Sequence, residues 1–309
     1  MPFAMLTAGT RTVLLAIFVL LVVASVASWI MHHRHGGEKY VELRQRVRAW
    51  WVMVIIFVVA IALDRRLSIA FFAFVSFLAL KEYFSLIPTR RADRRVLFWA
   101  YLSIPVQYYW VARGWYGMFI VFIPVWVMLL ISARMVTIGE TKDFLRAVGT
   151  IQWGLMLMVF AISHIAYLLA LAPMGEGAAL VLFLVLLTQL NDVAQYIWGK
   201  SFGKHTILPT VSPNKTVQGL VGGILTTTIL SYLLAPVLTP LSRPDSIAVG
   251  LIIGMGGFLG DTTIGALKRD LGVKDAGTMI AGHGGVLDRV NSLTYTAPLF
   301  LHFLRFYYF

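Results

Sequence analysis

The chain has 309 residues, of which 59% are hydrophobic and only 13% are charged, and its mean hydropathy is +0.80. A soluble domain is roughly 45–50% apolar and about 25% charged, so this composition predicts an integral membrane protein. The chain has no cysteine, which excludes disulfides, thiolate metal sites and a cysteine nucleophile. Its net charge of +12 is typical of basic loops beside a membrane, and no soluble basic domain suggests nucleic acid as a partner.

Apolar runs predict an all-α integral membrane protein with about nine or ten transmembrane helices, since roughly 20 residues cross a bilayer. In chain order the runs cover residues 12–31, 50–63, 67–87, 96–111, 115–132, 150–172, 178–198, 217–238, 246–267 and 290–306. The first is too long for a typical signal peptide, so we expect it to be retained, although Ser25-Val26-Ala27 resembles a cleavage site. We assign residues 1–149 to a supporting, lipid-facing part and residues 150–309 to a catalytic part.

Charged residues between and within the runs predict the orientation. The segment 32–49 is predicted as a basic loop, and most of the 26 Lys and Arg residues lie in the loops after the odd-numbered helices. Because Lys and Arg favour the cytoplasmic side, we place these loops in the cytoplasm and both termini outside. The third run also carries Lys81-Glu82; such a pair inside a span is often functional, or Lys81 extends to the interface.

Three carboxylates fall in one layer on the predicted cytoplasmic side. Asp192 and Asp261 each lie about six residues, or roughly 9 Å, before a helix end, and Asp288 lies just before the last helix. Converging carboxylates repel one another unless a cation joins them, and oxygen ligands without His or Cys favour Mg²⁺ or Mn²⁺. The alternative is that Asp192 and Asp261 form structural ion pairs with Lys200 and Lys268.

Glycines and cations close to these acids predict phosphate binding. Gly282, Gly284 and Gly285 allow backbone N–H groups to approach an anion, with His283 as a further donor, or they form a flexible turn. Ser212 and Lys215 precede a helix start, where a Ser or Thr N-cap is the simpler interpretation. Four cations suit a polyphosphate, or a solvated basic loop: Lys268, Arg269, Lys274 and Arg289.

Together these motifs resemble the CDP-diacylglycerol synthase (phosphatidate cytidylyltransferase) family over about residues 188–293. The matching motifs are Asn191-Asp192, Phe202-Gly203-Lys204-His205, Val211 to Gly219, Lys268-Arg269, Lys274-Asp275-Ala276-Gly277 and Gly282 to Arg289. Three positions depart from the family: Gly265 replaces Ser, Ala281 replaces Pro, and Asn291 replaces an Asp that in the family lies close to the metal pair.

The resemblance implies transfer of CMP from CTP to phosphatidate, with Mg²⁺ required and K⁺ as a possible second cation. It implies metal binding by Asp261 and Asp288, a lining acid in Asp192, and phosphate binding by the glycine loop and the nearby cations. The implied catalytic residues are Asp192, Asp261, Asp288 and Lys268. The implied substrate-binding residues are Ser212, Lys215, Arg269, Lys274, His283, Gly284, Gly285 and Arg289.

The resemblance also implies a bacterial inner-membrane enzyme facing the cytoplasm, and a homodimer. Three alternatives stay open at this point. The first is an enzyme of the same chemistry with another lipid-phosphate acceptor, and the second is a catalytically silent relative. The third, from another class, is a cation transporter that uses the intramembrane Asp residues.

Overall fold

The computed structural model describes residues 6–35, 38–62, 64–90, 93–173, 175–273, 276–277 and 284–309. The first elements are α1 (Ala8–His35), α2 (Glu38–Ala62), α3 (Arg65–Leu86) and α4 (Arg94–Arg113). Two longer helices each contain a π-helical segment. The first consists of α5 (Tyr116–Val121), η3 (Phe122–Val127) and α6 (Met128–Val136). The second consists of α7 (Phe144–Gly154), η4 (Leu155–Ala161) and α8 (Ile162–Leu171). The C-terminal half holds α9 (Glu176–Phe202), β1 (Thr206–Leu208), β2 (Ser212–Thr216), α10 (Val217–Leu238), α11 (Arg243–Asp270), α12 (Val286–Val290) and α13 (Leu293–Tyr307).

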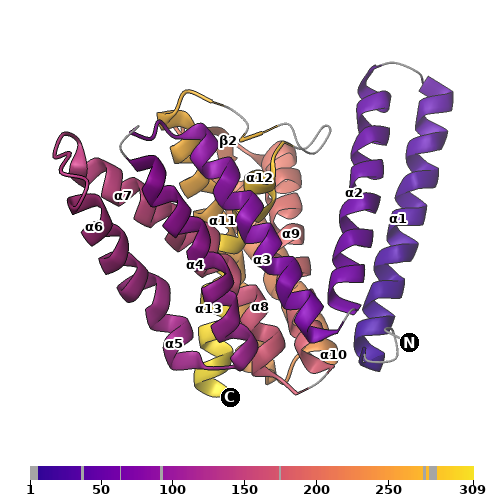
Figure 1. Cartoon of the computed structure of the whole chain (residues 1–309). Helices are drawn as coiled ribbons and strands as arrows, with labels where there is room; N and C mark the ends of the chain where they lie inside the picture. The colour runs from indigo at the N-terminus through magenta and orange to yellow at the C-terminus, as the bar shows by residue number, and fades with distance from the viewer. Residues whose placement is uncertain are drawn as a thin grey trace.

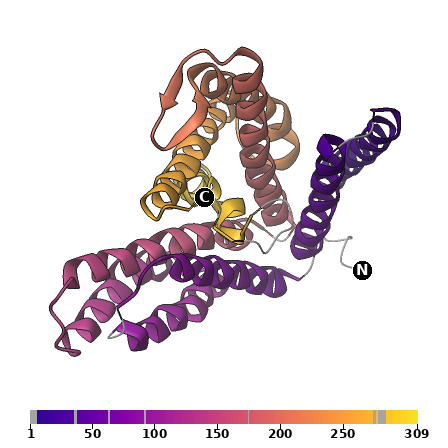
Figure 2. The ribbon, with the colours of Figure 1, turned by 90° about the horizontal axis from the view of Figure 1, so that it is seen from above.

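The helices form two slabs with a separate hairpin (Figures 1 and 2). Helices α3 to α8 make one slab, α9 to α11 make the other, and α13 lies between them. The α1–α2 hairpin stands apart at one side. Helix α1 begins and α13 ends at the lower end of Figure 1, whereas β2 and α12 lie at the upper end.

Seven helices of the described chain are long and apolar enough to cross a membrane, which confirms the predicted all-α membrane fold. The other three predicted spans correspond to α2, α4 and α13, which are shorter or more polar. One predicted detail is wrong, because helix α2 already begins at Glu38, inside the segment predicted as a loop. The last predicted helix, residues 290–306, corresponds to α13, and the short helix α12 before it was not predicted.

Burial differs sharply between the helices, and it locates the core. In the apolar stretch of α1 17% of the residues are buried, as expected for a helix that faces lipid. In the apolar stretch of the α7–α8 helix 78% are buried. Phe183 of α9 and Phe300 of α13 are fully buried, with ring centroids 5.6 Å apart. The core therefore runs through α8, α9 and α13, below the end where β2 and α12 lie.

Small residues allow the helices of the second slab to approach closely, which is common in membrane bundles. A Cβ added at Gly250 of α11 would lie 2.5 Å from the Cα of Thr228 on α10, and one added at Gly222 would lie 2.3 Å from the Trp198 ring on α9. Thr216 caps the start of α10 by accepting a hydrogen bond from the Gly219 N–H at 3.1 Å. This confirms the Thr N-cap interpretation of that run.

We predict that Gly250→Ala destabilises the protein by about 1–3 kcal/mol, because the new methyl group meets backbone atoms that cannot rotate away. The midpoint of thermal unfolding in detergent should fall by several degrees. The matched control is Gly149→Ala in α7, where no atom lies within 4 Å of the added Cβ. Equal unfolding midpoints for the two variants would contradict the close α10–α11 contact.

Candidate functional site

Polar side chains from distant segments meet at the upper end of the bundle in Figure 1. The C-terminal half of α9 supplies Asp192, β2 supplies Lys215, and α11 supplies Asp261 and Lys268. Asp288 comes from α12, and residues 291–292 connect α12 to α13. These side chains form two lysine–carboxylate clusters.

The first cluster is centred on Asp261, and we name it the Asp261 cluster; its members are Asp192, Gln195, Lys215, Asp261, Asn291 and Ser292. The Lys215 ammonium lies 2.7 Å from Asp261 Oδ2 and donates to Gln195 Oε1 at 3.1 Å. Asn291 Nδ2 donates to the other oxygen, Asp261 Oδ1, at 2.5 Å. Both Asp261 oxygens therefore face a donor.

Asp192 is held in the same cluster by a different bond. Ser292 Oγ donates to Asp192 Oδ2 at 2.8 Å, and the Ser292 N–H donates to Asn291 Oδ1 at 2.7 Å. Asn191 and Ser292 are almost fully buried, and Asp192 Oδ1 is buried with no hydrogen-bond partner among the described residues. A buried oxygen without a partner is costly, so Asp192 Oδ1 is the carboxylate oxygen of this cluster that is most in need of a ligand.

The second cluster is centred on Asp288, and we name it the Asp288 cluster; its members are Glu82, Lys268, Gly284, Gly285 and Asp288. Lys268 Nζ lies 2.7 Å from Asp288 Oδ1. The N–H groups of Gly285 and Ala276 donate to Asp288 Oδ2 at 3.1 and 2.9 Å. Gly284 has φ +75°, and a Cβ there would lie 2.4 Å from Asp288 Oδ2, so this position requires glycine.

Glu82 of α3 is part of this cluster, although its role was not predicted. It is 8% exposed, and its Oε2 accepts a hydrogen bond from the Leu287 N–H at 2.6 Å. A Cβ at Gly285 would lie 1.9 Å from Glu82 Oε1. The carboxylate therefore ties the first slab to α12. The signal for Glu82 in the sequence was a charged acid within an apolar helix. In the structure its neighbour Lys81 is exposed and Glu82 is buried, so Glu82 is the member of the pair that points inward.

We predict that Glu82→Ala destabilises the protein by about 1–3 kcal/mol, because the Leu287 N–H loses its acceptor in a buried position. Glu82→Gln keeps an acceptor oxygen and should lose less. Thermal unfolding in detergent measures both, with Glu140→Ala as the exposed control. Equal losses for all three variants would show that Glu82 does not hold α12.

The remaining predicted site residues lie around the two clusters. Ser212 is half-buried on β2, Arg289 is half-buried on α12, and Arg269 is exposed, with its Nε donating to the Val211 carbonyl at 3.2 Å. Lys274 and His283 lie outside the described residues. The alternative of ion pairs with Lys200 and Lys268 has the wrong partners, since Asp261 pairs with Lys215 and Lys268 pairs with Asp288.

The predicted metal pair, Asp261 and Asp288, is divided between the two clusters. Within the part of the chain that the structure describes, no three Asp, Glu or His side chains come together as a metal site. The oxygens of the Asp261 cluster do fit one hard cation, because Asp192 Oδ1 has no partner there and Asp261 adds a second carboxylate. Mg²⁺ binding stays a prediction.

A cavity of about 630 Å³ lies beside the Asp288 cluster, between α3, α7 and α11. Tyr83 and Leu267, the chain neighbours of Glu82 and Lys268, line it. At its rim the Asp93 carboxylate lies 2.6 Å from Arg90 Nε and raises the pKa of that guanidinium above its ordinary value. The cavity is within the size range of small-molecule sites, but its lining carries both signs of charge.

Comparison with known proteins decides the family. The sequence model of the cytidylyltransferase family matches residues 44–307, which include both clusters. The chain belongs to the cytidylyltransferase family. This confirms the resemblance drawn from the motifs, and membership implies CTP as the nucleotide substrate.

Relatives of this cytidylyltransferase differ in how much of the chain they match. The "Uncharacterized protein YnbB" of Escherichia coli K12 is 43% identical over 299 residues, covering 95% of this chain and 97% of that protein. The "Phosphatidate cytidylyltransferase" of Staphylococcus saprophyticus is 35% identical over 144 residues, 46% of this chain and 55% of that protein. The protein of the same name from Staphylococcus aureus (strain COL) is 34% identical over 144 residues. The chain thus spans about half the length of the phosphatidate cytidylyltransferases that it matches.

Proposed function

We propose that this cytidylyltransferase transfers CMP from CTP to phosphatidate, giving CDP-diacylglycerol and pyrophosphate. The observation that carries the proposal is that two lysine–carboxylate pairs, Lys215–Asp261 and Lys268–Asp288, each have one member on α11, a helix long and apolar enough to cross the membrane. Asp261 and Lys268 are seven residues apart on α11, which places them on the same face about 10 Å apart. Lys215 and Lys268 therefore bring two cations to the same face of α11, where they would bind the phosphate groups of the substrates.

The chemistry needs positioning more than a strong base. A phosphate monoester is already largely ionised at neutral pH, so its oxygen can attack the α-phosphorus of CTP directly. A P–O bond forms to the lipid phosphate, the bond from the α-phosphorus to the bridging oxygen breaks, and pyrophosphate leaves with that electron pair. Lys215 and Lys268 would exchange their carboxylate partners for phosphate oxygens and so neutralise charge as it shifts.

The Asp261 cluster would hold the divalent cation. Asp192 and Asp261 supply hard oxygen donors, and Asn291 and Ser292 keep these two carboxylates in place. Mg²⁺, when bound, neutralises phosphate charge during transfer.

The proposed location is a bacterial inner membrane with the site facing the cytoplasm. Both clusters lie at the end of the bundle opposite the beginning of α1 and the end of α13. The start of α2 and the C-terminal end of α11 also lie at this upper end, and they carry Arg44, Arg48, Lys268 and Arg269, as expected for the cytoplasmic side.

A different lipid phosphate is the second candidate acceptor, and the comparisons with relatives leave this candidate open. The relatives named for phosphatidate match 46% of this chain, whereas the relative that matches 95% has no named substrate. The two acceptors would use the same transfer chemistry, so only an acceptor screen separates them.

The test is pyrophosphate release by the purified full-length protein in detergent. CTP is supplied with phosphatidate, with other lipid phosphates or without lipid, and each reaction is run with Mg²⁺ and with EDTA. We expect Mg²⁺-dependent release that requires phosphatidate. If pyrophosphate were released only with another lipid phosphate, that lipid would be the acceptor in place of phosphatidate. CTP binding without release would indicate a silent member, and cation flux in liposomes without CTP turnover would indicate a transporter.

A further inference from the structure

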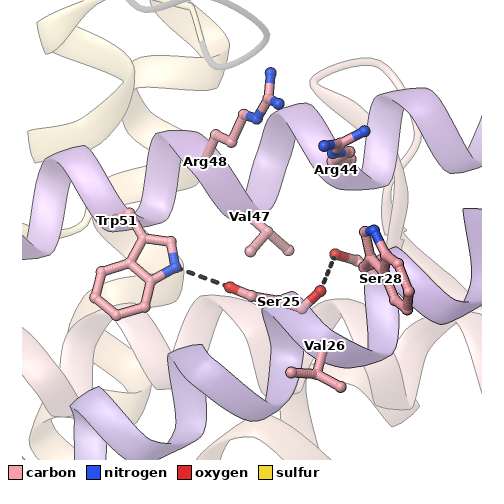
Figure 3. Close-up of a pocket in the computed structure, with 8 residues that line it drawn as sticks. Ser25, Val26, Ser28, Arg44, Val47, Arg48 and Trp51 are labelled. Atoms are coloured by element: carbon pink, nitrogen blue, oxygen red, sulfur yellow. Dashed lines mark hydrogen bonds between the residues drawn. The ribbon is translucent and has the colours of Figure 1, made fainter.

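A second cavity, of about 330 Å³, lies between α1 and α2 (Figure 3) and belongs to neither cluster. Arg44 and Arg48 line it from α2, one helical turn apart, while Ser25 and Ser28 line it from α1. None of its described lining side chains is an Asp or Glu. The cavity therefore carries two positive charges and no negative one.

Two like charges one turn apart destabilise a helix by a few tenths of a kcal/mol unless an anion lies near them. Among the described side chains, no carboxylate lies within ion-pair distance of Arg44 or Arg48. Both guanidinium groups have donors available, and a guanidinium matches the geometry of phosphate oxygens. The arrangement is suited to an anion that comes from outside the chain.

The hydroxyl groups of the cavity stabilise its shape. Trp51 Nε1 donates to Ser25 Oγ at 2.9 Å (Figure 3), and Ser25 Oγ donates to the Leu21 carbonyl at 2.7 Å. Ser28 Oγ donates to the Ser25 carbonyl at 2.9 Å. These bonds join α1 to α2 at Trp51 and use the donors of both serines. The two arginines are thus the charged groups left to bind a ligand.

The level of the cavity in the membrane indicates the kind of anion. The apolar stretch of α2 runs from Val47 to Ala62, so Arg44 lies one turn before it and Arg48 lies in its first turn. Trp29 and Trp51 line the same cavity, and Trp is enriched where a membrane meets water. On α1, Val26 lines the cavity and is 51% exposed, so apolar surface continues from it toward the hydrocarbon.

We infer that this cavity binds the phosphate group of an anionic membrane phospholipid, with its acyl chains along α1. The site is separate from the proposed transfer reaction, because none of its lining residues belongs to the Asp261 cluster or the Asp288 cluster. A lipid bound here would fill the space between α1 and α2 and hold this end of the hairpin at the membrane interface.

The experiment compares lipid binding by Arg44→Gln/Arg48→Gln with the unchanged full-length protein. Delipidated protein in detergent is titrated with phosphatidylglycerol, and bound lipid is counted by native mass spectrometry. Parallel titrations use phosphatidylcholine, which has no net charge, and inorganic phosphate. Since each basic residue near a membrane surface contributes roughly fivefold in affinity, we expect the double variant to bind phosphatidylglycerol roughly thirtyfold more weakly.

The matched control is Arg34→Gln/Arg95→Gln, which removes two exposed cations outside the cavity. It should bind phosphatidylglycerol like the unchanged protein. Arg44→Lys/Arg48→Lys keeps the charge and should retain most of the binding, which separates loss of the site from loss of folding. Equal binding by the double variant and the control would overturn the inference. So would phosphatidylcholine binding as tightly as phosphatidylglycerol, or inorganic phosphate alone saturating the site.

Discussion

Asp261→Asn is expected to lower the rate of pyrophosphate release by about a thousandfold, the upper range for loss of one electrostatic contact to a reacting phosphate. The substitution keeps the size of the side chain and removes its charge. Lys215, 2.7 Å away, then loses its carboxylate partner, and the cluster loses one of two carboxylates that would hold a cation. We expect the loss in kcat, since the charge acts on the transferring group rather than on CTP binding alone.

The control for Asp261→Asn is Asp270→Asn. Asp270 is the last residue of the same helix, and it is exposed. It should keep nearly full activity, and thermal unfolding of both variants shows whether each is folded. If Asp261→Asn retained more than about a tenth of the activity while Asp270→Asn matched it, the Asp261 cluster would not be the reaction centre.

Asn291→Asp is expected to make the stability of the protein depend on a divalent cation. Asn291 is 8% exposed, and its Nδ2 now donates to Asp261 Oδ1 at 2.5 Å. An aspartate would place a second negative charge against the first, and two unit charges 4 Å apart repel by about 4 kcal/mol near a protein surface. A cation bound between them removes this repulsion, so the variant should bind Mg²⁺ more tightly than the unchanged chain.

Thermal unfolding with EDTA and with saturating Mg²⁺ measures this effect. In EDTA the unfolding midpoint of Asn291→Asp should fall by about 8–16 °C, since the repulsion is about 4 kcal/mol and each kcal/mol corresponds to roughly 2–4 °C. Mg²⁺ should restore the loss through binding to the folded state. Asn214→Asp, on an exposed position of β2, adds the same charge and should show neither change. If the unfolding midpoint of Asn291→Asp were the same in EDTA and in saturating Mg²⁺, no cation would bind at Asp261.

These two predictions concern the hydrogen bond between Asn291 and Asp261, because one substitution changes its acceptor and the other changes its donor. The motif resemblance implies an acid at position 291, and in this chain the amide donor Asn291 satisfies one oxygen of Asp261 without a metal. Lys215 satisfies the other oxygen. Both oxygens of Asp261 therefore have donors without a cation, and Asp192 Oδ1 is left as the oxygen that a ligand would satisfy. Activity assays across Mg²⁺ concentration would show how this altered arrangement is used.

The sequence alone determined the class of fold and the family. Apolar runs long enough to cross a bilayer predicted the membrane helices, and the motif residues from Asn191 to Arg289 predicted a cytidylyltransferase. These features are local, because hydropathy depends on composition along the helix and a motif is a fixed spacing. The helical start of α2 was missed for the same reason: Glu38 to Ala49 is polar, and hydropathy does not detect a polar helix that extends beyond the membrane.

Only the tertiary structure decided which charges meet. Asp261 pairs with Lys215, which lies 46 positions earlier on a β-strand, rather than with Lys268 on its own helix. Glu82 reaches Leu287 across 205 positions, and it joins the two slabs at α12. Such partners depend on how helices pack, on glycines such as Gly250 and Gly285 that allow close approach, and on the direction of each side chain. The spacing of residues along the chain does not contain this information. Whether two residues far apart in sequence lie close together depends on how the helices pack.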